Sequence, residues 1–503
     1  MKYSLLALAL LLFISAAAQK KSSNPKSFAA SITEADLKKH LYVVAAKEME
    51  GRETATEGQR KAAAYIENAF KLLGLQPGNQ GSYQLPYPVY RDSLVAAHMV
   101  VNGKELVINL DFQPSLAFNN NGTIYFSEVV FAGYGIVDST YNSYGTVNVR
   151  GKAVLIAEGG PDGFSGERGQ INSFAKILAA REKGAAAVFL VSSNFKPAGP
   201  GNMYVNLFKE SQYPAFYTIS DKTAELLIDG SWSTMKEKIK KEKQEPMPLK
   251  VDVQLEVNKK IEKLQSSNVL GVLEGTDKKN EYLVVTAHYD HLGKRGETVY
   301  YGADDDGSGT VSVLEIAEAF VKAKAAGKGP RRSILFMTVS GEEKGLWGSQ
   351  YYSNHPTIHP DLITANLNID MIGRIDTERK KPDTLNYVYV VGDDKLSSEL
   401  KPLSEGVNNK YSKLVLDYKF NDPNDRSRIY YRSDHYNFAK IGIPVIFYYD
   451  GMLLADYHRP TDTPDKINFK LMAKRAQLVF YTAWEMANRE TMMKRDIPLP
   501  KME

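Results

Sequence analysis

The chain has 503 residues, of which 43% are hydrophobic and 24% charged, and its formal net charge is +4. This length predicts more than one domain, the composition is that of an ordinary globular protein, and the small net charge gives no indication of nucleic acid as a partner. Because the sequence contains no Cys, disulfides, thiolate nucleophiles and thiolate zinc sites are excluded, so any metal must be held by His and carboxylate side chains.

The N-terminal residues are predicted to be a targeting segment. After a positively charged start, residues 5–14 form an apolar core of signal-peptide length, and residues 16–18 fit the small-residue cleavage pattern. We predict a signal peptide over residues 1–18, cut before Gln19, and therefore a secreted or periplasmic protein; a buried N-terminal helix is the alternative. Residues 19–30 are expected to be a disordered spacer. No later stretch is long and apolar enough for a transmembrane helix, so stable membrane insertion is not expected.

Residues 31–111 are expected to contain two amphipathic helices. Thr33 is predicted to cap the first, with an acid three residues on. The second is expected over residues 62–73, and a glycine follows it. Glu50-Gly51-Arg52 is expected in the loop between them.

From residue 112 to about residue 257 the pattern changes to short strands and many turns. One helix, over residues 174–183, is expected between two of these strands, and the charge run at residues 236–243 is interpreted as a solvated helix or linker. We therefore expect a separate β-rich domain over residues 112–257.

Residues 258–503 show strands that alternate with helices. This order predicts an α/β fold, with a mostly parallel mixed sheet sandwiched by helices. Active sites of such folds lie beyond the carboxyl ends of the strands. The expected strands are residues 282–287, 333–339, 367–371, 387–391 and 444–448, and the expected helices are residues 310–322, 345–353 and 469–488.

Acidic and His residues follow these strands at their carboxyl ends, and a further His lies in the loop before the last helix. Two His and several carboxylates without Cys are typical of a catalytic zinc site. Two adjacent zinc ions need one bridging carboxylate and about two further ligands each, which makes five. One residue of the Glu342-Glu343 pair could be a ligand while its neighbour accepts a proton from the metal-bound water. The residues in question are His288, Asp290, Asp304–Asp306, Glu342, Glu343, Asp370 and His458.

These residues lie in segments that closely resemble the co-catalytic zinc aminopeptidases, a family that also includes glutamate carboxypeptidase II and the catalytically inactive transferrin receptor. The resemblance implies a zinc-exopeptidase fold into which a protease-associated domain, residues 112–257, is inserted. The matching segments are Thr286-Ala287-His288-Tyr289-Asp290-His291, Gly302-Ala303-Asp304-Asp305-Asp306-Gly307-Ser308-Gly309, Ser340-Gly341-Glu342-Glu343, Asn368-Ile369-Asp370-Met371-Ile372-Gly373 and Tyr457-His458.

The resemblance also implies a role for each residue. His288 and Asp370 would bind one Zn²⁺, Glu343 and His458 the other, and Asp305 would bridge the two ions. Glu342 would be the general base, Asp290 would orient the His288 ring, and Tyr457 would help to stabilise the oxyanion. The family's cis peptide would fall at Asp305–Asp306, and Ser433-Asp434-His435 resembles an element near the substrate pocket. The other His residues, namely His40, His98, His291, His355, His359 and His435, are expected to be surface or packing residues.

The expected function is hydrolysis of N-terminal residues from peptides by a metallopeptidase with two zinc ions per chain. A carboxypeptidase of the same fold is an alternative, because a basic cluster that could bind a terminal carboxylate is available in Arg374, Arg426, Arg428 and Arg432. Glutaminyl cyclase shares the fold but does not need all five ligands. A receptor-like binding protein would have lost ligands, and this chain has lost none.

Overall fold

The structure is a computed structural model that describes residues 24–138, 141–164, 171–192, 203–241 and 245–500. The predicted signal peptide and its cleavage site lie outside the described residues. The ordered chain starts earlier than expected, because α1 (Lys26–Ala29) falls within the stretch interpreted as a spacer. Its Ala29 is fully buried and Phe28 stacks on Trp484 at 5.9 Å, so this helix packs against the body of the protein.

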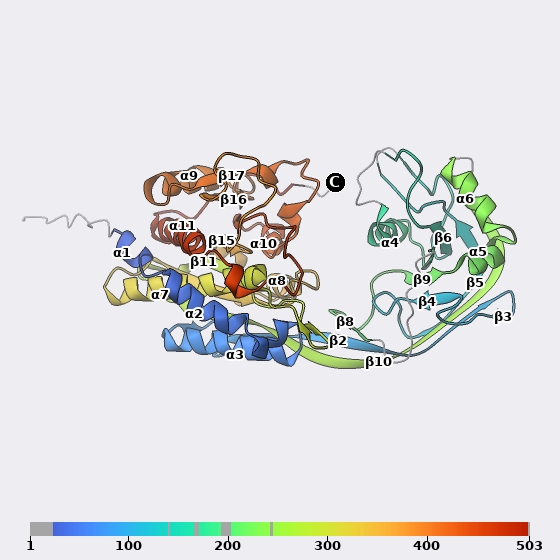
Figure 1. Cartoon of the computed structure of the whole chain (residues 1–503), viewed down its shortest axis with the longest axis horizontal. Coiled ribbons are helices and arrows are strands. Elements are labelled where there is room, and N and C mark those ends of the chain that lie inside the picture. The colour runs from blue at the N-terminus through green and yellow to red at the C-terminus, as the bar shows by residue number, and fades with distance from the viewer. Residues whose placement is uncertain (1–23, 139–140, 165–170, 193–202, 242–244, 501–503) are drawn as a thin grey trace, which may run out of the picture.

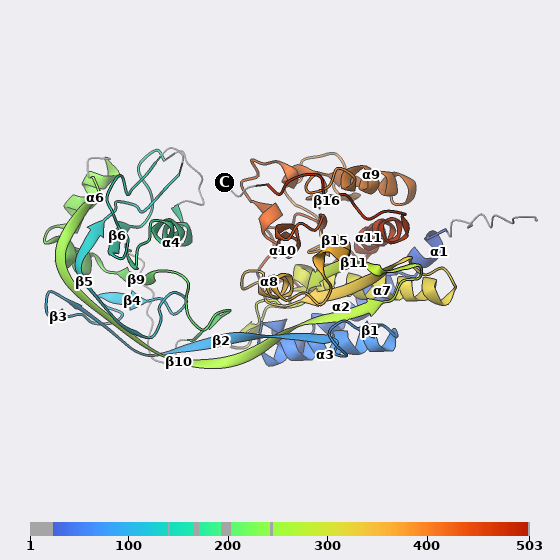
Figure 2. The ribbon, with the colours of Figure 1, turned by 180° about the vertical axis from the view of Figure 1, so that it is seen from behind.

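Two long antiparallel strands, β2 (Gln84–Val101) and β10 (Met247–Leu273), run through the whole length of the molecule. Figures 1 and 2 show them as a ribbon along one side, with one body at each end. Inside the ribbon the buried Lys259 ammonium lies 2.7 Å from the Asp92 carboxylate. Residue 257, the predicted end of the β-rich domain, lies within β10, a continuous strand that both bodies share.

The first body is built on a sheet with the strand order β17-β16-β18-β15-β11-β14-β10. Strand β11 pairs in parallel with β14 and β15, β15 with β18, and β16 with β17, whereas β16/β18 and β10/β14 are antiparallel. The predicted mixed, mostly parallel sheet is therefore confirmed. Its strands are β11 (Lys278–His288), β14 (Arg332–Val339), β15 (Ile363–Ile369), β16 (Tyr387–Val391), β17 (Val415–Asp417) and β18 (Val445–Tyr449).

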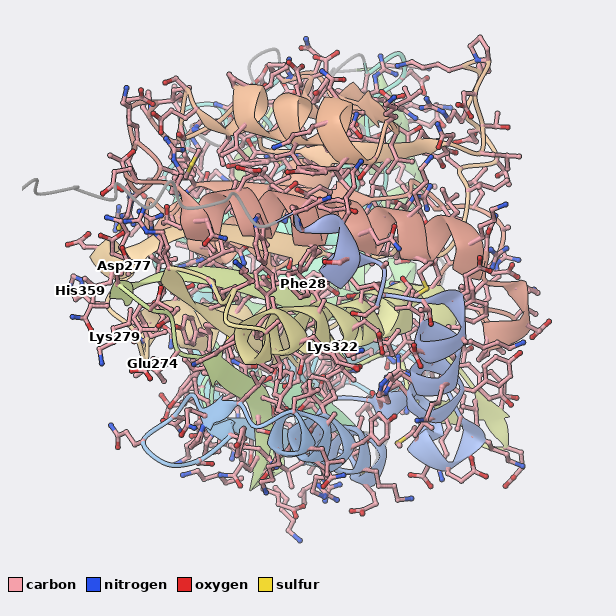
Figure 3. All side chains as sticks on the ribbon, turned by 90° about the vertical axis from the view of Figure 1, so that its left-hand side faces the viewer. Phe28, Glu274, Asp277, Lys279, Lys322 and His359 are labelled. Carbon is pink, nitrogen blue, oxygen red and sulfur yellow. The ribbon has the colours of Figure 1, made fainter. Side chains whose placement is uncertain are left out.

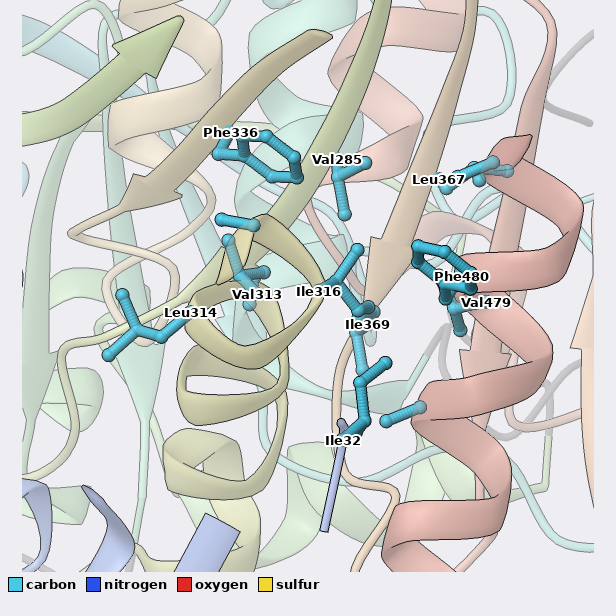
Figure 4. Close-up of a cluster of buried hydrophobic side chains, with 14 of the residues drawn as sticks. Ile32, Val285, Val313, Leu314, Ile316, Phe336, Leu367, Ile369, Val479 and Phe480 are labelled. Atoms are coloured by element: carbon cyan, nitrogen blue, oxygen red, sulfur yellow. The ribbon is translucent and has the colours of Figure 1, made fainter. Parts of the chain in front are cut away.

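Helices cover both faces of this sheet because successive strand residues point to opposite sides. Val285 and Phe336 pack into one hydrophobic core, and their neighbours Val284 and Leu335 pack into the other. Figure 4 shows the first core, in which strand side chains meet those of α7 and α11. The helices are α2 (Glu34–Val44), α3 (Glu57–Leu72), α7 (Gly309–Ala325), α8 (Trp347–Asn354), α9 (Leu400–Tyr411), α10 (His435–Lys440) and α11 (Phe469–Asn488).

The periodic segments form the kinds of element that the sequence predicts, but the bounds differ: β15 ends at Ile369, before the predicted residue 371, and α3 begins at Glu57, before the predicted residue 62. Thr33 caps α2 by accepting a hydrogen bond from the backbone N–H of Asp36. Helix α11 has the predicted bounds. Viewed from the end of the first body, α3, α7, α11 and α9 lie one above another, and charged side chains such as Glu274 and Lys279 lie at the edge, 3.2 Å apart (Figure 3). None of the helices in the described part of the chain has the length and apolar character that crossing a membrane requires.

The second body contains parallel strand pairs and more helix than expected. Strands β5, β6, β7 and β9 pair in parallel in that order, and two further hydrophobic cores lie on their two faces. Helix α4 is the expected one and α6 carries the predicted charge run, but α5 was not expected. The elements are β4 (Phe112–Pro114), β5 (Gly122–Phe131), β6 (Ala153–Ala157), β7 (Ala187–Val191), β8 (Met203–Asn206), β9 (Ala215–Ile219), α4 (Ser173–Glu182), α5 (Asp221–Ile228) and α6 (Trp232–Lys240).

Candidate metal centre

The carboxyl ends of three neighbouring strands bring the predicted residues together. His288 is the last residue of β11 and pairs in register with Val339, the last residue of β14. Glu342 and Glu343 follow β14 by a few residues, and Asp370 follows β15 directly. Because β11 lies between β14 and β15, the side chains after all three strands converge on one edge of the sheet.

The turn before α7 brings Asp305 into this group. Its peptide bond to Asp306 is cis, as the resemblance implies. The Asp462 carboxylate accepts hydrogen bonds from the backbone N–H groups of Asp304 and Asp305 at 3.0–3.1 Å. Asp462 therefore holds the turn in place.

Asp306 lies with His288 and Asp370 in a group that could hold a metal ion, but its carboxylate is also bound by the backbone around it. Its carboxylate accepts hydrogen bonds from three backbone N–H groups, those of His288 (3.1 Å), Gly309 (2.8 Å) and Met371 (3.0 Å). Since both of its oxygens are used to hold the surrounding loops, Asp305 is the acid of this turn that is free to face the site.

One group of possible ligands surrounds the His288 ring. Its Nε2 lies 3.2 Å from Asp305 Oδ1 and 3.5 Å from Asp370 Oδ1. Its Nδ1 lies 3.1 Å from the backbone oxygen of Asp290. A carbonyl can only accept, so Nδ1 carries a proton, and in the neutral ring Nε2 has a lone pair that a metal could use.

A second group surrounds the other oxygen of the same aspartate. His458 Nε2 lies 3.2 Å from Asp305 Oδ2 and 3.0 Å from Glu343 Oε2. Each oxygen of Asp305 thus faces a different His, which is the arrangement that a bridging carboxylate requires.

Several buried polar atoms at this place have no hydrogen-bond partner within the protein. They include His288 Nε2, Asp305 Oδ2 and Glu343 Oε1. Unpartnered buried polar atoms are costly, and metal ions bound at this place would satisfy all three. Atoms that share one tetrahedral zinc ion at the usual bond lengths lie about 3.3 Å apart, so the separations of 3.0–3.5 Å fit zinc.

Asp290 contacts the His288 ring, as expected, but through its backbone. Its carboxylate lies 3.7 Å from His288 Nδ1, so the orienting contact to the ring comes from its backbone carbonyl instead. The carboxylate accepts hydrogen bonds from the Thr54 hydroxyl (2.7 Å) and from the backbone N–H of Glu342 (3.2 Å). Asp290 therefore positions both the ring and the loop that carries the two glutamates.

Glu342 lies at the edge of the centre, with its Oε2 4.0 Å from His288 Nε2. Burial, together with the negative charges of Asp370 and Glu343, raises the pKa of its carboxyl well above the ordinary value. A carboxylate with a raised pKa is a better proton acceptor for a water molecule.

Tyr457 lines a cavity that Asp305, Glu342 and Asp370 also line. Its ring stacks on His458 with centroids 3.8 Å apart, and its hydroxyl accepts a hydrogen bond from Arg432 at 3.2 Å. Burial raises its pKa, so the hydroxyl keeps its proton and can donate to an oxyanion. The cavity is lined by Asp305, Glu342, Asp370, Met371, Ile429, Arg432, Phe447, Tyr449, Leu453 and Tyr457.

The Ser433-Asp434-His435 element is buried beneath this cavity. The Ser433 hydroxyl accepts a hydrogen bond from Asn368 at 2.9 Å, and the His435 ring stacks on Phe447 at 4.7 Å. Burial lowers the pKa of His435 to about 3, which keeps its ring neutral. The element therefore packs, through His435, against Phe447, which lines the cavity.

His291 was expected to have a packing or surface role, and the structure places it in the centre. The side chain is fully buried, and its Nδ1 lies 2.7 Å from Glu343 Oε1 and 3.8 Å from Asp305 Oδ2. The only sequence signal was its position three residues after His288. Among the remaining His residues, His98 and His359 are exposed, as expected.

Arg52, from the Glu50-Gly51-Arg52 loop, lies outside the sheet and binds the loops that surround the centre. The side chain is fully buried. Its guanidinium donates hydrogen bonds of 2.6–2.9 Å to the backbone oxygens of Tyr289, Val44, Tyr301 and Gly302. It thereby ties the loop after β11 to the turn that carries Asp305.

Replacement of Arg52 by Met should lower the free energy of unfolding by at least about 3 kcal/mol, because buried carbonyls without a partner cost about 1–3 kcal/mol each. Chemical denaturation of the purified protein would measure this loss. The matched control is Arg60→Met: Arg60 lies on the surface, 2.8 Å from Glu57, and its replacement should change stability by less than about 0.5 kcal/mol. Equal effects of the two changes would contradict the supporting role of Arg52.

Residues 268–483 match the model of peptidase family M28. A probable leucine aminopeptidase of Trichophyton verrucosum is 32% identical over 216 residues, which are 42% of this chain and 55% of that protein. A probable leucine aminopeptidase of Arthroderma otae is 31% identical over 231 residues, 45% of this chain and 59% of that protein. The chain thus spans a little over half the length of these curated relatives.

Two solved structures resemble most of the chain. An aminopeptidase from Aneurinibacillus sp. strain AM-1 has a TM-score of 0.59 at 18% identity, and the match covers 95% of this chain and 100% of that one. A zinc aminopeptidase from Bacillus subtilis has a TM-score of 0.52 at 20% identity over 93% of this chain and 99% of that one. At these identities the likeness establishes the fold.

Proposed function

We propose, from the match of residues 268–483 to peptidase family M28, that the protein is a zinc-dependent aminopeptidase with two zinc ions per chain. The observation that carries the proposal is Asp305, whose two oxygens face His288 and His458 at 3.2 Å each. His288 and Asp370 would hold one ion, Glu343 and His458 the other, and Asp305 would bridge them.

The chain's own residues would supply the remaining chemistry. Zinc, when bound, would polarise the scissile carbonyl and lower the pKa of the attacking water. Glu342 would accept the proton of that water and donate it to the leaving amine. Asp290 would hold Glu342 in place through the backbone hydrogen bond at 3.2 Å. The Tyr457 hydroxyl would donate to the oxyanion while Arg432 fixes its position.

The cavity favours an aminopeptidase over a carboxypeptidase, because the four arginines that could bind a terminal carboxylate do not line it together. Arg374 pairs with Asp456 at 2.9 Å. Arg428 lies over the Tyr431 ring at 5.0 Å and Arg426 is exposed. Of the four, Arg432 alone lines the cavity. Three acids, Asp305, Glu342 and Asp370, also line it, and they would suit the positively charged amino terminus of a peptide.

We further propose that the chain is exported by its N-terminal segment, residues 1–18, and that residues 112–257 are an inserted protease-associated domain that controls substrate access. Within the described part of the chain, no residue between 112 and 257 belongs to the clusters of His and acidic residues that could hold a metal.

Assays with the purified mature chain test the activity. Aminoacyl p-nitroanilides should be hydrolysed, whereas the same compounds with an acetylated amino group should not react, because the amine that the acidic cavity recognises is blocked. A chelator should abolish the hydrolysis and added zinc should restore it. Cleavage of acetylated peptides from their carboxyl end would instead favour the carboxypeptidase alternative, and hydrolysis that persists without metal would contradict the zinc mechanism.

A further inference from the structure

We propose that His291 is a direct ligand of the metal ion at the Glu343–His458 position, through its Nδ1 atom. The inference rests on the proposed zinc centre and adds a sixth protein ligand to the five that the resemblance implies.

The protein fixes the His291 ring at this place. Its backbone N–H donates a hydrogen bond to the Arg52 carbonyl at 3.3 Å. Gly302 packs flat against the ring, since a Cβ atom at that position would lie 2.5 Å from Cγ of His291. Gly302 has a φ of +57°, and Arg52 also bonds its carbonyl oxygen. These contacts hold the buried ring close to the carboxylates.

The contacts of Nδ1 are those of a ligand more than those of a hydrogen-bond donor. Nδ1 lies 2.7 Å from Glu343 Oε1, yet both atoms lack a hydrogen-bond partner. At this distance only poor alignment prevents a hydrogen bond. Two polar atoms that are close but do not point at each other are arranged like neighbours around a shared cation.

His288 provides an internal reference for this geometry. Its Nε2 atom is likewise buried, close to carboxylate oxygens at 3.2 and 3.5 Å, and without a hydrogen-bond partner. His288 and His291 thus present one nitrogen each to the two sides of Asp305, and His458 adds a second imidazole on the side of His291.

The two metal positions then differ in their number of protein donors. Asp305, Glu343, His458 and His291 would hold one ion, whereas His288, Asp305 and Asp370 would hold the other. His458 is 38% exposed at its side chain, so the buried His291 would be the more rigid imidazole of the pair. We expect the two ions to be lost at clearly different free zinc concentrations.

The test measures zinc bound per chain against buffered free zinc, without substrate, for the wild-type protein, His291→Asn and His291→Phe. The amide of Asn can still donate a hydrogen bond from near the place of Nδ1, but it is a poor zinc ligand. Loss of a residue that is hydrogen-bonded to a metal ligand, but does not itself bind the metal, weakens metal binding by about 10–100-fold. We expect both variants to bind one of the two ions more than about 100-fold more weakly and the other almost unchanged.

The control is His355→Asn, because His355 stacks on Tyr351 outside the centre, and it should bind zinc as the wild-type protein does. If His291→Asn keeps both ions within about tenfold while His291→Phe weakens one, His291 is only a hydrogen-bond partner of Glu343 and the proposal is wrong. If both variants bind zinc as the wild-type protein does, the proposal about His291 is also wrong, but the proposed zinc centre stands. A wild-type protein that binds no zinc would refute the centre itself. Circular dichroism of the metal-free proteins checks that each variant is folded. If His291→Asn does not fold, His291→Phe, which keeps a ring against Gly302, still tests whether one zinc ion is lost.

Discussion

Replacement of Glu342 by Gln is expected to lower kcat by about 10²–10⁴-fold, the usual contribution of general-base catalysis. The amide keeps the shape of the side chain but cannot accept the proton of the attacking water. Because Glu342 lies 4.0 Å from His288 Nε2 and outside the two ligand groups, both zinc ions should stay bound and KM should change little. Steady-state kinetics together with elemental analysis would measure both quantities.

Glu343→Gln is the matched comparison for this prediction. Glu343 Oε2 lies 3.0 Å from His458 Nε2, so an amide at this position should weaken metal binding, and part of the lost activity should return at high zinc. If instead Glu342→Gln loses zinc while Glu343→Gln keeps both ions and only slows turnover, the two roles are reversed. If neither change matters, this loop is not part of a zinc centre.

Replacement of Asp305 by Asn is expected to abolish activity and to remove zinc from both positions. Its two carboxylate oxygens face the two imidazoles separately, at 3.2 Å from His288 and 3.2 Å from His458. An amide has only one oxygen to offer, and it brings no negative charge to hold two cations close together. Elemental analysis should therefore find less than one zinc per chain, and added zinc should not restore hydrolysis.

A surface aspartate serves as the control for Asp305. Asp277 pairs with Arg331 at 2.7 Å on the outside of the protein, and Asp277→Asn should keep two zinc ions and full activity. An Asp305→Asn variant that still binds two ions and hydrolyses its substrate would refute the bridging role.

Much of the first body could be predicted from the sequence because its signals are local. Strands that alternate with helices imply a parallel sheet, and such sheets place their carboxyl ends at one edge. His288, Glu342, Glu343 and Asp370 each follow a recognisable strand, so their convergence follows from chain order alone. The long helix over Phe469–Asn488 was predicted with its observed bounds because its apolar face repeats at the helical period.

What the tertiary structure decided depends on contacts between distant segments. Asp305 and Asp306 are adjacent acids of the same type, and only the backbone N–H groups around the turn determine which one is held and which one faces the site. In the same way, the Asp290 carbonyl, and not its carboxylate, contacts the His288 ring. Local sequence contains no information about such partners, since they come from strands and loops far along the chain.

His291 and Arg52 illustrate the same limit most clearly. A His three residues after another His is usually an exposed or packing residue, and a lone Arg in a loop is usually solvated. Here Arg52 donates hydrogen bonds to the carbonyls of Tyr301 and Gly302, which lie 249 and 250 residues further along the chain, and Gly302 lies against the His291 ring. The sequence by itself indicated the fold class and the residue types of the proposed two-metal centre, because strands and helices follow from periodicity and chain order. Which nitrogen or oxygen faces the metal positions was decided only when the N-terminal loop, the Asp305 turn and the loop of His458 packed together, because burial and hydrogen-bond partners are properties of the folded chain.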